Sequence, residues 1–195
     1  MKTKKHGFSI IEVVLVLGIA ALIFMMIFLA LPSLLASQRD ADRKATVMGF
    51  VSSLKTYQTN NSRGALPVLS GNGPETFSFT EARSSSGAGN WRAFIRDYVD
   101  SNFIDPTGTE VKFYIANCLN SGGGNLSISA PCAYSSDFAN INTSSSVESG
   151  LNYTLYVAVG AVCDGDHAVK SGSTRDVAAV YVLERAGRYC YSTNN

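Results

Sequence analysis

Apolar residues follow a different pattern in each part of this chain. From Phe8 to about Ala36 nearly every position is apolar, and no charged side chain occurs from Val13 to Gln38. About 20 consecutive apolar residues suffice for a helix to cross a bilayer. The stretch therefore predicts a helix that is apolar on almost every face and that lies in lipid or inside a helical bundle.

From Ser37 onward polar residues return and the apolar positions become periodic. The apolar residues recur at helical spacing, at Val47, Phe50, Val51, Leu54 and Tyr57. This spacing predicts that the helix continues as an amphipathic helix, with one stripe packed on a domain, and ends near Thr59.

The remaining pattern predicts a short helix and several strands. Residues 60–90 are rich in Ser, Gly and Asn and predict mostly loop. Asn90 is placed to cap a short helix whose apolar face is Trp91, Phe94, Ile95 and Tyr98. Residues 105–108 predict a turn, and strands are predicted at 111–116, 153–162, 177–184 and, after a turn at 186–187, at 188–191.

A helix followed by strands predicts an α+β fold, in which a long N-terminal helix packs on a small antiparallel sheet. The patterns divide the chain into a leader at 1–7, an apolar helix at 8–36 and a globular domain at 37–195. The domain includes the amphipathic half of the helix.

The junction between leader and helix carries the most specific motif of the chain. A Lys-rich leader ends at Gly7, Phe8 begins the apolar run, and Glu12 is the one carboxylate near its start. An ionisable group in a membrane segment is costly and marks a functional site by default.

The segment from Lys4 to Val16 resembles the prepilin signal of type IV pilins and pseudopilins. In that family a membrane peptidase cleaves after the glycine, the new first residue is N-methylated, and the glutamate takes part in assembly. Gly7, Phe8 and Glu12 match these three positions. The resemblance covers about the first 30 residues, and the remainder of the chain is similar to the family only in its layout.

The resemblance implies a structural subunit of a type IV pilus rather than an enzyme. It implies a single span in the cytoplasmic membrane, cleavage by prepilin peptidase, and export by an assembly platform and its ATPase into an extracellular homopolymer. Glu12 would pair with the methylated amine of Phe8 in the adjacent subunit, because a lone buried carboxylate is strongly disfavoured. Such filaments serve adhesion, twitching motility or DNA uptake, so the surface loops would meet host cells, surfaces or DNA.

Three alternatives remain open at this stage. The chain is also compatible with a pseudopilin of a type II secretion or competence system, or with a membrane-anchored binding domain that never polymerises. An ordinary secretory signal has an apolar core of about 7–15 residues and a small-residue cleavage site at its far end. Residues 30–37 offer such a site, although the apolar run is longer than that core.

All four cysteines lie beyond the apolar helix. An even number in an exported domain predicts two disulfides, for which three connectivities are possible. We favour Cys118–Cys132, which brackets a Gly- and Ser-rich loop, and Cys163–Cys190, which joins a strand end to the C-terminal strand. Free thiols and zinc are the alternatives, and no pair has the C-x₂-C spacing of common zinc sites.

Other chemistry is only weakly indicated. Asp164 and Asp166 are only a weak calcium candidate, because calcium takes 6–8 oxygen ligands and a solvated acidic turn between strands explains them better. His167 is the one histidine outside the leader, so no Ser/His/Asp triad can be assembled, and no enzyme activity, resident metal or cofactor is expected. Loss of the three leader lysines lowers the formal net charge from +1 to −2, and no basic patch indicates nucleic-acid binding.

Overall fold

The fold begins with one long helix, α1 (Ile10–Asn60), in the computed structural model of the chain. The structure describes residues 7–61, 64–69, 75–100, 103–118, 153–171, 173–185 and 187–194. α1 continues through Pro32 and ends within a residue of the predicted position. The chain divides into two compact units, Met1–Gln38 and Arg39–Asn195, and α1 contributes to both.

The described part of the N-terminal unit is an apolar helix whose large side chains are exposed. Every large apolar side chain between Phe8 and Leu35 is at least 43 % exposed. By length and composition this helix could cross a membrane or serve as a signal sequence. The helix therefore presents an extensive apolar surface. In water, this surface must be covered by a partner outside the unit.

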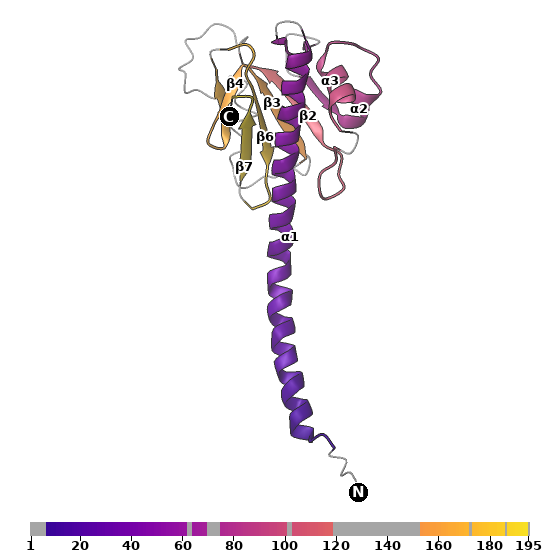
Figure 1. Ribbon diagram of the computed structural model, residues 1–195, viewed down its shortest axis with the longest axis vertical. Helices are drawn as coiled ribbons and strands as arrows, with labels where there is room; N and C mark the ends of the chain where they lie inside the picture. Colours follow the sequence, from indigo (N-terminus) through magenta and orange to yellow (C-terminus); the bar gives the residue numbers. More distant parts are fainter. Residues whose placement is uncertain are drawn as a thin grey trace. The chain divides into compact units, whose positions relative to one another are not determined.

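The C-terminal unit packs the second half of α1 on a mixed, mostly antiparallel sheet (Figure 1). The order of this sheet is β1-β2-β3-β6-β7, and only the β2–β3 pair is parallel. The strands are β1 (Glu75–Ser78), β2 (Lys112–Asn117), β3 (Thr154–Val159), β6 (Val177–Val182) and β7 (Arg188–Ser192). A two-stranded antiparallel sheet consists of β4 (Ala161–Asp164) and β5 (His167–Lys170). The predicted α+β fold is confirmed.

The core lies between the predicted stripe of α1 and the sheet. Val47, Phe50, Val51 and Leu54 are at most 1 % exposed and contact inward side chains of β2, β3 and β6. Alternate residues of these strands face a second cluster built largely from small residues and cysteines. Because the strands are buried on both faces, their sequences read as continuous apolar runs rather than as alternating ones.

The short helix after Asn90 is present as predicted. It is α3 (Trp91–Tyr98), and the Asn90 side chain accepts a hydrogen bond from the Ala93 N–H at 2.8 Å. The cap satisfies one of the N–H groups that a helix N-terminus leaves unpaired. The aromatic face of α3 then packs on α1, with the Phe94 and Phe50 ring centroids 5.7 Å apart.

Two sequence predictions are corrected by the structure. Within the segment predicted as loop, Ser78 and Glu81 form a capping box that starts α2 (Phe79–Arg83), directly after β1. The strand predicted at 153–162 is two strands, β3 and β4, in different sheets. Gly160 separates them at φ 76°, a conformation that glycine adopts without steric cost.

Candidate functional site

The Gly7–Phe8 junction lies in an exposed, non-helical segment before α1. Phe8 is 86 % exposed. Among the described residues other than its chain neighbours, none has an atom within 4 Å of where a side chain at Gly7 would begin. The described part of the junction is therefore sterically open, as a cleavage site must be. The rest of the leader, residues 1–6, lies outside the described residues.

Glu12 lies in the first turn of α1, where the helix dipole favours a negative charge. Its Oε2 atom accepts a hydrogen bond from the Ser9 N–H at 3.4 Å. This contact is half of a capping box, a role that the Ser9-x-x-Glu12 spacing encodes and that the sequence analysis missed. The carboxylate therefore has a partner within its own helix.

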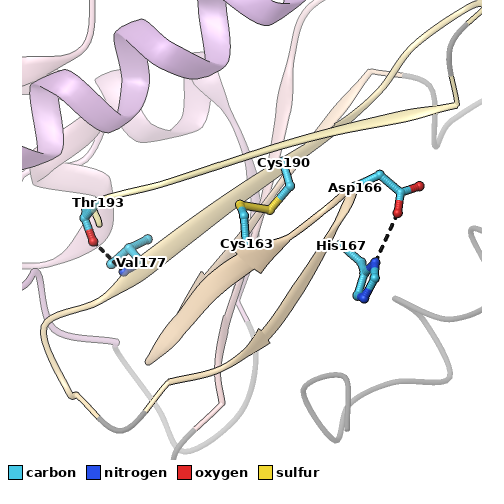
Figure 2. The surroundings of a disulfide bond; sticks show 6 residues. All are labelled: Cys163, Asp166, His167, Val177, Cys190 and Thr193. Carbon is cyan, nitrogen blue, oxygen red and sulfur yellow. Dashed lines mark hydrogen bonds and ion pairs between the residues drawn. A yellow bond between two sulfur atoms is a disulfide. The ribbon is translucent and has the colours of Figure 1, made fainter. Parts of the chain in front are cut away.

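The predicted pair Cys163–Cys190 is a disulfide in the structure, with a Cα–Cα distance of 5.7 Å (Figure 2). Cys163 is in β4 and Cys190 is in β7, so the bond joins the two-stranded sheet to the last strand of the five-stranded sheet. In the other predicted pair, Cys118 is buried just after β2. Its predicted partner, Cys132, lies outside the described residues, and that pairing stays a prediction.

Of the two weak calcium candidates, Asp166 contacts basic side chains. Asp166 lies 3.1 Å from His167 Nδ1 (Figure 2). It also lies 3.6 Å from Arg188 Nη2. The hydrogen bond with His167 holds the pKa of Asp166 below its usual value, and Arg188 acts in the same direction. Among the residues that the structure describes, no group of three Asp, Glu, His or Cys side chains is arranged to hold a metal ion.

A buried charge cluster near the start of the second unit was not predicted from the sequence. Its centre is the carboxylate of Asp105, which accepts hydrogen bonds from Arg43 Nε at 2.7 Å and Nη2 at 3.1 Å. The same carboxylate accepts from the Tyr181 hydroxyl at 2.9 Å and from the N–H and hydroxyl of Thr107 at 3.0 and 2.7 Å. Asp105 and Arg43 are each 3 % exposed, so the ion pair is shielded from water.

Titration of the cluster follows from this geometry. Burial opposes ionisation of Asp105, but the hydrogen bonds from Arg43 and Thr107 outweigh it and hold the pKa of Asp105 below its usual value. Burial, with the adjacent Asp105 charge, raises the pKa of Tyr181. Both groups therefore keep the charge states that their hydrogen bond requires across the neutral range.

The cluster extends from α1 to the chain that follows β6. Asp40 accepts hydrogen bonds from the backbone N–H groups of Glu184 and Arg185 at 2.7 and 3.1 Å. Glu184 binds Arg39 through two hydrogen bonds of 2.9 and 2.8 Å, and its carboxylate lies 3.2 Å from Arg43 Nη2. We call the set Arg39, Asp40, Arg43, Asp105, Tyr181 and Glu184 the charge clasp.

The sequence carries only a faint signal of the charge clasp. Residues 38–44 are a polar run in an otherwise apolar helix, and such runs usually form a solvated face. Burial of Arg43 depends on Asp105, which is 62 positions away. That partner is known only once the fold is known.

Comparison with protein-family models, with curated proteins and with solved structures gives no significant match to this chain. The observations that bear on its function are therefore the open Gly7–Phe8 junction, the exposed apolar half of α1, the position of Glu12 and the disulfide-linked α+β unit.

Proposed function

We propose that this chain is a pilin-like structural subunit, anchored by its apolar helix, cleaved after Gly7 and polymerised through that helix into a surface filament. The observation that carries the proposal is the apolar half of α1, on which every large side chain is exposed, directly after a Gly-Phe junction. In a membrane those side chains contact lipid. In a filament they contact the same helices of other subunits.

The proposal gives Glu12 a role in assembly. Cleavage would leave Phe8 with a free amine, and a carboxylate entering a dry helical bundle needs a countercharge. An amine of the adjacent subunit supplies it, and such a head-to-tail contact does not close, so it produces a filament. Loss of one partner from a buried pair costs about 3–5 kcal/mol.

The proposal includes the partners and location that such a subunit requires. It would be held in the cytoplasmic membrane before assembly, and a prepilin peptidase, an assembly platform and an ATPase would act on it. Its role would be structural rather than catalytic, and the domain would form the outer surface of an extracellular filament.

A second candidate is a membrane-anchored binding domain that does not polymerise. The observation that favours it is the hydrogen bond from the Ser9 N–H to Glu12. A capping role satisfies the carboxylate within one chain, so the motif would then need no neighbouring subunit.

Mass spectrometry tests the processing step. Material sheared from cells should contain a chain that begins at Phe8 and carries one added methyl group. A chain that begins near Ser37 would show ordinary signal cleavage and would refute the proposal. Gly7→Ala should leave the uncleaved precursor in the membrane.

Two substitutions at Glu12 separate the two candidates. Glu12→Val removes both the charge and the cap, whereas Glu12→Gln keeps an oxygen that can accept from Ser9 and removes only the charge. Under the filament proposal both variants are processed and membrane-resident, and both yield few filaments by electron microscopy. Filaments from the Gln variant at wild-type yield would show that the carboxylate acts as a cap and not as an assembly charge.

A further inference from the structure

The apolar contacts between α1 and the sheet do not by themselves define which turn of the helix meets which strand. Hydrophobic burial is non-directional and depends mainly on the area removed from water. The packed stripe of Val47, Phe50, Val51 and Leu54 repeats every helical turn. Before Gln38 the helix sequence is apolar at nearly every position, so helix turns displaced along α1 also offer apolar side chains.

The charge clasp, by contrast, is directional. Arg43 donates two hydrogen bonds to one carboxylate, which is a geometry that tolerates little displacement. Asp40 binds two successive backbone N–H groups beyond β6, one turn earlier on the helix. These two contacts fix α1 against separate parts of the chain, the turn at Asp105 and the segment at Glu184. A shift of the helix by one turn, about 5.4 Å, breaks both.

We infer that the charge clasp selects the register of α1 against the sheet. A buried ion pair adds little net stability, because desolvation of its charges offsets their attraction, and apolar replacement of both partners is often neutral. Removal of a single partner leaves an unpaired buried charge and is strongly destabilising. The clasp therefore acts chiefly by destabilising packings in which α1 is shifted against the sheet. In those packings Arg43 and Asp105 are buried without each other. In the proposed filament, and only on that proposal, a single register would hold every domain at the same position along its helix.

The test uses the full chain in detergent micelles and three variants of the central pair. Arg43→Met keeps the apolar stem and removes the charge. Asp105→Asn also removes a charge; its single oxygen, at the Oδ1 position, accepts from Thr107, and its amide N–H then faces the Tyr181 hydroxyl, which can accept. Arg43→Met leaves the buried Asp105 carboxylate without a countercharge and should lower the Tm by about 10 °C. Asp105→Asn should lower the Tm less, because the Glu184 carboxylate stays 3.2 Å from Arg43 Nη2. The double variant should recover most of the loss caused by Arg43→Met, because no unpaired charge remains at the centre of the clasp.

Register is measured by NMR of the ¹⁵N-labelled chain. The wild type should give one set of backbone amide signals for residues 39–54, and the double variant should give several sets or exchange-broadened signals. The matched control is Arg39→Met, the same change one turn earlier at the exposed edge of the clasp. It should retain one set of signals and nearly the wild-type Tm.

Two results would overturn the inference. One is a single, wild-type set of amide signals in the double variant, which would show that apolar packing alone defines the register. The other is a double variant as unstable as Arg43→Met, which would make the clasp a stabilising element instead of a selector. Failure of the wild-type chain to form filaments would refute the proposed function and leave this measurement unaffected.

Discussion

The Tyr181 hydroxyl gives the sharpest test of the electrostatics at the centre of the clasp. Tyr181 is 1 % exposed, and its hydroxyl donates to Asp105 Oδ2 at 2.9 Å. Tyr181→Phe keeps the ring and removes only this donor, so no large cavity forms. Arg43 and Thr107 still donate to the same carboxylate.

The expected loss follows from the charge of the acceptor. A hydrogen bond to a charged group contributes about 1.5–3 kcal/mol to the free energy of unfolding. Because Arg43 and Thr107 still donate to the carboxylate, we expect Tyr181→Phe to lose an amount near the lower end of this range, about 1.5–2 kcal/mol at pH 7. In a chain of this size each kcal/mol corresponds to about 2–4 °C, so the Tm should fall by about 3–8 °C.

The loss should also depend on pH, with a defined sign. The pKa of Asp105 is lowered in the fold, so its contribution is fully present above the unfolded pKa of about 3.9 and is lost as the pH falls below it. The Tm difference between wild type and Tyr181→Phe should therefore be constant from pH 5 to pH 8, and it should narrow only as the pH falls through the lowered pKa of Asp105 in the fold. The pKa of Tyr181 is raised, so its contribution is present below about pH 10 and is lost at higher pH.

The assay is thermal denaturation of the full chain in micelles, followed by circular dichroism between pH 3 and pH 8. Tyr98→Phe is the matched control, because Tyr98 is a partly buried tyrosine whose ring packs on the same core. Its effect should not vary with pH in this range. An unchanged Tm for Tyr181→Phe between pH 5 and pH 8 would show that the hydroxyl does not stabilise the ionised carboxylate.

The remaining predictions concern the core, a helix cap and the disulfides. Phe50→Ala should lower the free energy of unfolding by about 3–5 kcal/mol, because Phe50 is 1 % exposed and its ring contacts three other phenylalanines; a loss below about 1 kcal/mol in denaturant titration would contradict the observed packing. Asn90→Ala should cost about 1 kcal/mol and Asn90→Ser much less, since serine also caps; equal losses would exclude the capping role. Non-reducing peptide mapping should recover the Cys163–Cys190 peptide and the predicted Cys118–Cys132 peptide, and any other linkage would refute the pairing. Breaking the first of these bonds by Cys163→Ser should cost about 3–4 kcal/mol, given its separation of 27 residues.

Elements with local signals were predictable from the sequence. The helix from Ile10 to Asn60 follows from an apolar run and a periodic stripe, and α3 follows from a cap and an aromatic face. Strands β2, β6 and β7 follow from short apolar runs between turns. The motif at Gly7, Phe8 and Glu12 is likewise read from adjacent residues, although its role in assembly stays a prediction.

Elements that depend on distant partners were not predictable. β1 is a strand because it pairs with β2, with Phe77 opposite Phe113. The break at Gly160 became visible only in the fold, where the Gly160 N–H binds the Asp176 carbonyl and its carbonyl binds the Ser171 N–H. In each case the local sequence has only a weak preference, and a tertiary contact that forms on folding determines the structure.

The sequence by itself determined that a long apolar helix leads into an α+β unit, because periodicity and capping residues are local signals that extend over one or two helical turns. Only the tertiary structure decided that the polar run around Arg43 is buried and that Asp105 is its partner. A charged side chain is stable in an interior only where an opposite charge is fixed beside it. That condition concerns two residues brought together by the fold, so neither local sequence identifies the partner of the other.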